Sequence, residues 1–395
     1  MIIDVLLSIF CVLAFLVAAI IAAGRVFSAP RYSGKVSDHF NGKTFHNLEK
    51  SEAKGFGEAF KWMLNRKPGK WTRVENASFG EKPPARIEKD VRITFVNHST
   101  FLIQTDGFNI LTDPVWSDRT SPVSWAGPKR MRPPGLRFED LPKIDAVIIS
   151  HNHYDHLDLP TLEKIFEKYS PRIVAPLGIK RFLESKGMNV EEVDWWDEVH
   201  LNDAISVHPV PAQHFSGRGM FDRNATLWCG FVIKTNRGNL YFAGDTGYGE
   251  RTIREIANRH SPIRAAMLPI GAYKPEWFMS PIHISPEGAV KIHMELKAEI
   301  SIAMHFGTFP LADDGQFDPV EDLKIAMKKH SISPEEFLIL KEGEYLEILE
   351  DRTLRSLERV TFDLESSLDN KASILTRAER LSDKGVPSLK ENRKP

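Results

Sequence analysis

Histidine and aspartate side chains that suit a metal centre recur through the middle of this sequence. Four of them fall in one short stretch that reads H-x-H-x-D-H, and three more follow at wide intervals. The set is His151, His153, Asp155, His156, His214, Asp245 and His305. In an extended turn, alternate side chains project to the same side, so we expect His151 and His153 to face one position. Asp155 and His156 would enter the start of a helix and face a second position nearby.

These residues are sufficient for two metal ions. Three protein ligands with a water molecule are typical of a catalytic zinc site. One triad is His151, His153 and His214, and the other is Asp155, His156 and His305. Asp245 remains and would bridge the two ions. Two such ions about 4 Å apart can hold a hydroxide between them and polarise a phosphoryl or carbonyl oxygen. We therefore expect two Zn²⁺ ions per chain, although nitrogen and oxygen ligands also accept other divalent metals such as iron or manganese.

Cysteine usage argues against a purely structural site. Structural zinc sites fill the fourth position with protein, usually cysteine, and this chain has only Cys11 and Cys229, far apart in sequence. No disulfide framework can be built from them.

The candidate ligands lie at the ends of expected strands, which are typical places for active-site groups. The apolar run 145–150 leads directly into His151, the run 239–245 ends at Asp245, and the run 300–305 ends at His305. His98 and Asp113 also lie at expected strand ends, and Asp113 would support a ligand histidine through a hydrogen bond. Further strands are expected at 91–98, 101–105, 108–113, 172–176, 204–212, 227–235 and 265–270.

Helical spacing separates several of these strands, at 159–169, 249–259, 286–296 and 319–330. The chain is thus an α/β protein, with too many strands for a simple doubly wound sheet. Two mixed sheets with outer helices fit better, in a globular region over residues 91–350.

The N-terminus has the length and composition of a membrane segment. Residues 5–23 carry no charge, and about 20 apolar residues cross a bilayer. The alternative is a cleaved secretory signal, but the only charged side chain ahead of the run is Asp4. Arg25, Arg31 and Lys35 follow it, so the positive-inside rule places the catalytic domain on the cytoplasmic side. Residues 1–24 are therefore expected to be a single-pass membrane anchor.

Residues 25–90 are expected to connect the anchor to the globular region. An apolar stripe within them predicts an amphipathic helix, formed by Phe56, Ala59, Phe60, Met63 and Leu64. The stripe either lies in a lipid headgroup layer or packs on the core of the protein. At the other end, residues 351–395 form a polar, modestly basic tail.

Overall charge excludes one class of partner. The 395 residues contain 52 Lys+Arg and 53 Asp+Glu, a net charge of −1. A nucleic-acid binder would normally carry a basic excess, so no nucleic-acid partner is expected.

The ligand pattern resembles that of the metallo-β-lactamase superfamily. The similarity is closer to the group of phospholipases D that hydrolyse N-acyl-phosphatidylethanolamine, and it extends over about residues 91–345. The stretches that carry it are LTDP (111–114), GPKR (127–130), IDAVIISHNHYDHLD (144–158), PLG (176–178), DWW (194–196), FAGDTGY (242–248), PIGAYKPEWFM (269–279) and HFGTF (305–309). The resemblance implies an αββα sandwich.

The resemblance also implies roles for individual residues. All seven candidate ligands match the zinc ligands of the family, and His283 matches a position near the substrate phosphate. We therefore expect Asp245 and His283 to be catalytic. The chain has Ile282 where the family has a polar residue before this histidine, which bears on head-group contacts.

The expected function is zinc-dependent hydrolysis of a phospholipid phosphodiester, of the phospholipase D type. N-acyl-phosphatidylethanolamine-like lipids would give phosphatidic acid and N-acylethanolamine through attack by a metal-bridging hydroxide. Two alternatives stay open: a lactonase or phosphoester hydrolase with a soluble substrate, and a membrane-bound regulatory protein that binds metal without catalysis. Phospholipid and the membrane are the expected partners, and a homodimer is one of the assemblies left open. The sequence does not determine acyl or head-group preference.

Overall fold

Fifteen short strands form two sheets in the computed structural model, which describes residues 2–50, 54–75, 77–350 and 354–356. One sheet has eight strands, ordered β15 (Leu354–Ser356), β14 (Tyr345–Ile348), β1 (Val91–Asn97), β2 (Thr100–Thr105), β3 (Phe108–Thr112), β4 (Ala146–Ile148), β5 (Arg172–Pro176) and β6 (Val190–Val193). The other has seven, ordered β13 (Phe337–Leu338), β12 (Ile300–Met304), β11 (Ile263–Pro269), β10 (Gly238–Phe242), β9 (Gly230–Thr235), β8 (Ser206–Val210) and β7 (Val199–His200). Both sheets mix parallel and antiparallel pairs, as the sequence predicted.

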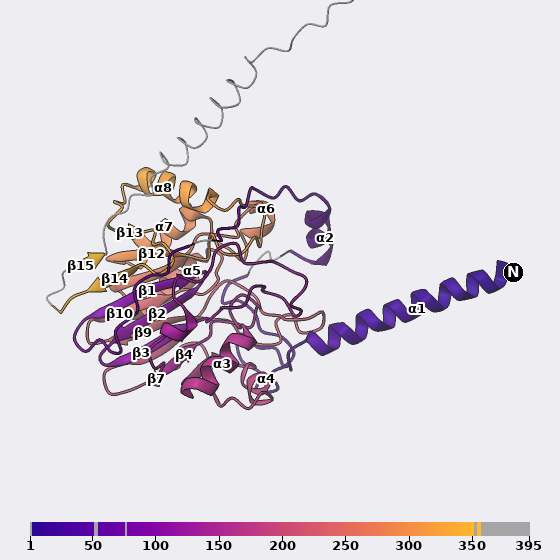
Figure 1. Cartoon of the computed structure of the whole chain (residues 1–395), viewed down its shortest axis with the longest axis horizontal. Helices are drawn as coiled ribbons and strands as arrows, with labels where there is room; N and C mark the ends of the chain where they lie inside the picture. Colours follow the sequence, from indigo (N-terminus) through magenta and orange to yellow (C-terminus); the bar gives the residue numbers. More distant parts are fainter. Residues whose placement is uncertain (1, 51–53, 76, 351–353, 357–395) are drawn as a thin grey trace, which may run out of the picture. The chain divides into compact units, whose positions relative to one another are not determined.

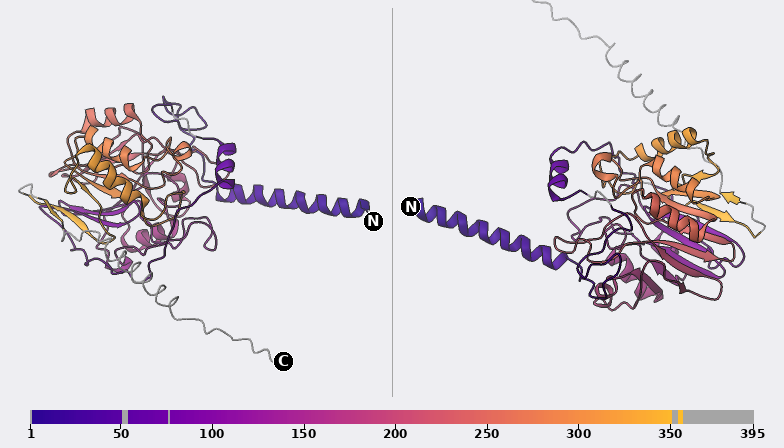
Figure 2. Two further views of the ribbon diagram at one scale, coloured as in Figure 1. Left: turned by 90° about the horizontal axis from the view of Figure 1, so that it is seen from above. Right: turned by 180° about the vertical axis from the view of Figure 1, so that it is seen from behind.

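Helices cover the outer faces of both sheets. On the first sheet lie α3 (Leu159–Tyr169) and α4 (Lys180–Glu184). The second sheet is covered by α5 (Glu250–His260), α7 (Pro286–Glu295) and α8 (Asp318–His330). Figures 1 and 2 show the strands between the magenta α3 and the orange α7 and α8. This four-layer arrangement confirms the expected sandwich of two mixed sheets with outer helices.

Alternation of apolar side chains along the strands explains the layering. In β4, Ala146 and Ile148 belong to the core between the sheets, whereas Val147 packs with Leu162 and Ile165 of α3. Successive side chains of a strand point to opposite faces, so a strand covered on both sides is apolar throughout.

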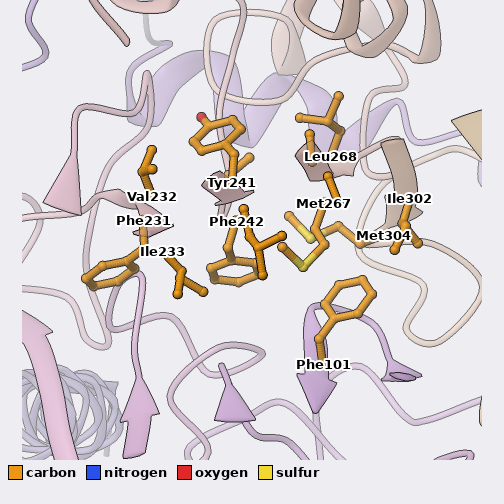
Figure 3. Packing of buried hydrophobic residues seen from close by; sticks show 14 of the residues in the cluster. Phe101, Phe231, Val232, Ile233, Tyr241, Phe242, Met267, Leu268, Ile302 and Met304 are labelled. Carbon is orange, nitrogen blue, oxygen red and sulfur yellow. The ribbon is translucent and has the colours of Figure 1, made fainter. Parts of the chain in front are cut away.

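The inner core is built from large side chains of both sheets. In Figure 3, Phe242, Met267 and Met304 point toward Phe101 of β2, whereas Tyr241 and Leu268 lie on the opposite side of their sheet. Packing of this kind holds the strand ends in fixed positions, which a metal centre requires.

The segment after the apolar N-terminal helix packs into the catalytic unit. Phe40 and Phe45 are fully buried in the inner core, and Asn47 accepts hydrogen bonds from His214 N (3.0 Å) and Trp228 Nε1 (2.9 Å). Residues 28–50 therefore do more than connect the apolar helix to the domain, and we call them the N-terminal strap. The contacts of the chain place Met1–Arg355 in one compact unit. Most of the polar tail expected at 351–395 lies outside the described residues.

Two helices precede the first strand. The apolar α1 (Ile2–Phe27) has the length and composition to cross a membrane, a test that a signal sequence also passes. The short α2 (Phe56–Leu64) coincides with the expected amphipathic stripe. Phe60, Met63 and Leu64 are 52%, 54% and 70% exposed, so these three side chains of the stripe do not pack on the core, whereas Ala59 lines a cavity of the domain. Trp62 contacts the domain, stacking on Phe278 of α6 (Glu276–Met279) with centroids 5.0 Å apart.

Candidate metal centre

The H-x-H-x-D-H stretch forms a tight turn immediately after β4. His153 O accepts hydrogen bonds from His156 N (3.1 Å) and Leu157 N (2.8 Å), which curls the chain back before α3 begins. His151 and His156 are buried, and Asp155 lies at the edge of the cavity described below. The turn thus directs four candidate ligands into one region.

The first triad comes together as the sequence predicted. His151 Nε2 and His153 Nδ1 lie 2.8 Å apart, and His214 Nε2 lies 3.3 Å from the same His153 nitrogen. Their ligand atoms can all face one ion. Three imidazole nitrogens at these separations are an arrangement suited to one small divalent cation.

The second triad lies beside the first, and Asp245 reaches both. Asp155 Oδ2 lies 3.5 Å from His156 Nε2 and 3.4 Å from His305 Nε2. Asp245 approaches His156 Nε2 at 3.2 Å, His305 Nε2 at 3.1 Å and His214 Nε2 at 3.7 Å. Asp245 therefore occupies the position of a bridging ligand.

Incompletely satisfied buried atoms show that this cluster fits bound metal. His156 Nε2, His305 Nε2 and Asp245 Oδ1 are buried and have no hydrogen-bond partner among the described residues. Asp245 contacts both rings as an ion pair, at 3.1 Å and 3.2 Å, but these contacts do not have the geometry of hydrogen bonds, so the buried cluster is incompletely satisfied without a cation. Divalent cations would satisfy all three, and the donor set of imidazoles and carboxylates suits zinc.

Asp113 orients one ligand histidine in each triad. Its Oδ2 accepts hydrogen bonds from His156 Nδ1 (2.7 Å) and from Ser150 Oγ (2.5 Å), while Ser150 Oγ accepts from His151 Nδ1 (2.9 Å). A proton held on Nδ1 leaves the Nε2 lone pair for a cation. One fully buried carboxylate thus fixes the tautomer of His156 directly and that of His151 through Ser150.

His98 is a contact of the second triad that was not expected. Its Nε2 donates to Asp155 Oδ2 (3.0 Å), its carbonyl accepts from His305 N (2.7 Å), and its ring lies 4.1 Å from that of His305. The sequence indicated only that His98 lies at the end of an expected strand. Its link to Asp155 depends on packing between segments 57 residues apart.

Three residues around the site have left-handed backbone conformations that side chains other than glycine adopt at a cost. They are His98 (φ 47°), Asp113 (φ 31°) and His305 (φ 60°). Each lies just after a strand, so the backbone turns sharply and aims its side chain at the cluster. Strained conformations of this kind persist where the surrounding structure imposes them.

His283 lies at the edge of the two triads. Its Nδ1 is 3.8 Å from Asp245 Oδ2, and its ring centroid is 5.1 Å from that of His214. The preceding residue contributes through its backbone, because Ile282 O accepts a hydrogen bond from His214 Nδ1 (2.8 Å). Ile282 also lines the cavity that leads to the cluster.

Burial and charge prepare the ligands for a cation. Burial lowers the pKa of His151 and His214 well below the usual range and that of His153 to about 4, so these imidazoles stay neutral. Burial would raise the pKa of Asp245, but the neighbouring His156 and His305 hold it well below its usual range. Although burial opposes a charge on His305, the carboxylates of Asp245 and Asp155 raise its pKa to about 9. A cation would replace the proton there.

A cavity of about 470 Å³ leads to the cluster from the surface. Its inner end is lined by His153, Asp155, Asp245 and His283. Its walls are largely apolar and include Trp62 of α2, Phe215, and Phe278 of α6. Substrate can therefore approach the centre along an apolar surface.

Comparison with known proteins agrees with this architecture. A family model described as a beta-lactamase superfamily domain matches residues 108–306. The chain is 36% identical over 273 residues to N-acyl-phosphatidylethanolamine-hydrolyzing phospholipase D 1 of Caenorhabditis elegans, covering 66% of this chain and 76% of that protein. It is 38% identical over 255 residues to the mitochondrial protein of that name in Saccharomyces cerevisiae, covering 61% of this chain and 54% of the yeast protein.

A solved structure shows the same fold at low sequence identity. A metallo hydrolase from Ignicoccus hospitalis has a TM-score of 0.50 and 23% identity, covering 65% of this chain and 98% of the archaeal one. The region matched by the family model, residues 108–306, contains the strands and turns that hold all seven candidate ligands. The chain belongs to the metallo-β-lactamase superfamily and is a metal-dependent hydrolase.

Proposed function

We propose that the protein is a membrane-anchored phosphodiesterase of the phospholipase D type that uses two zinc ions. Its substrates would be N-acyl-phosphatidylethanolamine-like phospholipids, and its products phosphatidic acid and N-acylethanolamines. The names of the worm and yeast relatives support this reaction class. The proposed metal ligands are His151, His153, Asp155, His156, His214, Asp245 and His305.

The observation that carries the proposal is the apolar cavity that ends at the candidate metal ligands. A small polar substrate needs few apolar walls, whereas a phospholipid must bring acyl chains along with its phosphate. Trp62 and Phe278 stack on each other in one wall, and Leu311 also contributes. The cavity therefore suits an amphiphile whose polar group reaches the metal centre.

Exposed apolar side chains near this wall support access from a bilayer. Phe60, Met63 and Leu64 of α2 are joined by Trp277 of α6, which is 49% exposed and lies 5.9 Å from Lys61 Nζ. An apolar helix face with aromatic and lysine neighbours is typical of segments that lie in a membrane interface. We propose that α1 anchors the chain with its domain on the cytoplasmic side, where basic residues following α1 would lie.

The reaction requires attack on phosphorus and departure of an alkoxide. Divalent ions, when bound, would neutralise the phosphate charge and lower the pKa of water. His283 would donate a hydrogen bond to a phosphate oxygen, because burial lowers its pKa to about 4 and leaves a neutral ring with one N–H. Asp245 would contact the metal ions of both triads and fix their relative positions. Water supplies the new P–O bond, the bond from phosphorus to the head-group oxygen breaks, and the head-group alcohol gains a proton.

Hydrolysis in ¹⁸O-water tests the reaction. Zinc-loaded protein in detergent micelles containing N-acyl-phosphatidylethanolamine should release N-acylethanolamine, with ¹⁸O appearing in phosphatidic acid by mass spectrometry. His151→Ala should abolish release, whereas His208→Ala, which changes a buried histidine far from the cluster, should not.

Other outcomes would contradict the proposal. Turnover of a lactone or of bis(p-nitrophenyl) phosphate without turnover of phospholipid would indicate a soluble substrate. Zinc binding without turnover of any of these compounds would indicate a regulatory protein.

A further inference from the structure

An arginine without a charged partner borders the cavity. Arg223 lies in the loop after His214 and lines the cavity together with His153 and Asp155. Within the described part of the chain, its guanidinium contacts the Phe215 ring and has no hydrogen bond to a side chain and no ion pair. Arg223 is exposed to solvent at the rim of the cavity, and partial desolvation lowers its pKa with no carboxylate raising it.

The neighbouring carboxylate is already used by the backbone. Asp222 accepts hydrogen bonds from Ala29 N (2.7 Å), Arg218 N (3.0 Å) and Gly219 N (2.8 Å). These bonds fix the loop that carries Arg223 and tie it to the second residue after α1. If α1 spans a bilayer, this loop lies at the level of lipid head groups.

The guanidinium of Arg223 lies over an aromatic ring that contacts a candidate metal ligand. Arg223 Cζ lies 4.2 Å from the centroid of Phe215, and the Phe215 ring packs edge-on against His153 with centroids 4.5 Å apart. A single aromatic ring therefore separates the guanidinium from a proposed metal ligand. A stacked guanidinium keeps its N–H groups available for an anion in the ring plane.

The metal pair leaves no need for Arg223 at the reacting phosphate. Asp155 and Asp245 offset only part of the charge of two divalent cations, so the pair and His283 can hold a singly charged phosphodiester. Arg223 instead offers a second positive group on the wall of the same cavity. A carboxylate beside the phosphodiester would match its two-pronged N–H geometry.

We propose that Arg223 is a specificity residue that binds an additional anionic group in the substrate head group. The substrates that fit best would be N-acylated phospholipids whose ethanolamine unit carries a carboxylate, rather than the plain ethanolamine form. This inference rests on the proposed phosphodiesterase activity and adds the class of head group.

Two matched lipids test the inference. They share acyl chains and differ only in the head-group carboxylate, and each is presented to the full-length, zinc-loaded protein in nonionic detergent micelles. We expect wild type to favour the carboxylate lipid by about tenfold in kcat/KM, in line with one charge-assisted contact at a partly exposed site. Arg223→Gln should lower this ratio toward one, mainly through KM, and Arg223→Lys should retain part of it.

Arg259→Gln is the matched control. Arg259 also stacks on an aromatic ring, at 4.2 Å from the Trp196 centroid, but it lies on α5 outside the cavity and neighbours Glu255. The Arg259→Gln substitution removes the same charge as Arg223→Gln, and this variant should keep the wild-type ratio of kcat/KM values for the two lipids.

Each outcome separates the two claims. A ratio that stays unchanged in Arg223→Gln would overturn the inference, as would an equal loss with both lipids, which would place Arg223 at the scissile phosphate. Wild type that favours the plain lipid would also overturn it. Failure of wild type to hydrolyse either lipid would instead overturn the proposed function, and the inference with it.

Discussion

At the scale of residues, the site depends on atoms that set the protonation of the candidate ligands. Asp113 orients His156 directly and His151 through Ser150, so one carboxylate acts on both triads. The H-x-H-x-D-H ligands could be predicted from the sequence because their spacing is local. The position of His98 beside Asp155 could not, because it depends on how β1 packs against a turn far along the chain.

Replacing Asp113 by asparagine should weaken metal binding. Asparagine removes the charge that holds protons on the Nδ1 atoms, and loss of such a partner typically costs about 10–100-fold in metal affinity. Chelator competition followed by elemental analysis measures the change. Asp145→Asn is the control, because Asp145 pairs with Arg86 (2.6 Å) at the other end of β4. Equal metal affinity in Asp113→Asn and wild type would contradict the assigned role.

Metal affinity should rise with pH. Carboxylates raise the pKa of His305 to about 9 and that of His156 well above its usual range, so both rings hold protons in the metal-free protein at neutral pH. Metal binding must release these protons, which makes binding weaker as the pH falls below about 9. With one or two protons released, affinity should fall on the order of tenfold to a hundredfold per pH unit. Competition with a chelator of known proton affinity, between pH 6 and 8.5, measures the metal affinity. An affinity that does not change with pH would contradict the protonation of His156 and His305.

At the scale of elements, long strands and helices were predicted well and short elements were not. The expected strands at 91–98 and 300–305 correspond to β1 and β12, and the helix at 159–169 corresponds to α3. The missed elements include the strands β6, β7, β13, β14 and β15, with two to four residues each, and the helices α4 and α6, with five and four residues. These elements are too short to show a period. The N-terminal strap was also missed as part of the core. Its two buried aromatic residues have no periodic spacing, and tertiary contacts alone fix them.

Protonation of His39 should stabilise the N-terminal strap. Burial opposes a charge on His39, but hydrogen bonds to Asp194 (2.8 Å) and Asp38 (2.7 Å) raise its pKa. A group with a raised folded-state pKa contributes stability that is complete below its unfolded pKa, near 6.5, and is lost as pH rises through the folded value. We expect wild type to exceed His39→Gln by roughly 1 kcal/mol at pH 6 and by less at pH 9. Thermal melts at both values measure this, with the exposed His46→Gln as control. A difference that grows with pH would contradict the assignment.

At the scale of the whole molecule, the proposed lipid substrate would reach the hydrolase domain through the cavity beside α2. The sequence alone predicted an apolar N-terminal helix and an amphipathic α2, but only the folded chain shows that α2 forms a wall of the cavity. The αββα sandwich could be predicted because two features of the sequence indicated the same fold: the many strands with helices between them, and the candidate ligands at strand ends. Formation of a homodimer stays a prediction.

Removing the apolar face of α2 should affect bilayer substrates selectively. Phe60→Ser with Leu64→Ser removes exposed apolar area and should lower turnover of vesicle lipid by roughly tenfold, since each buried side chain contributes about 1.5–3 kcal/mol and the anchor retains the protein at the surface. Turnover of a short-chain, dispersed phosphodiester should stay near the wild-type rate. Met294→Ser, on the outer surface of α7, is the control. Equal loss with both substrates would show that α2 serves the fold rather than the interface.

The central claim is that seven side chains hold two cations in one cluster. Anomalous diffraction from crystals of the zinc-loaded protein tests it most directly. We predict two peaks, one contacted by His151, His153 and His214 and the other by Asp155, His156 and His305, with Asp245 contacting both. A single peak, a peak held by His98 in place of His305, or no peak within reach of Asp245 would contradict the claim.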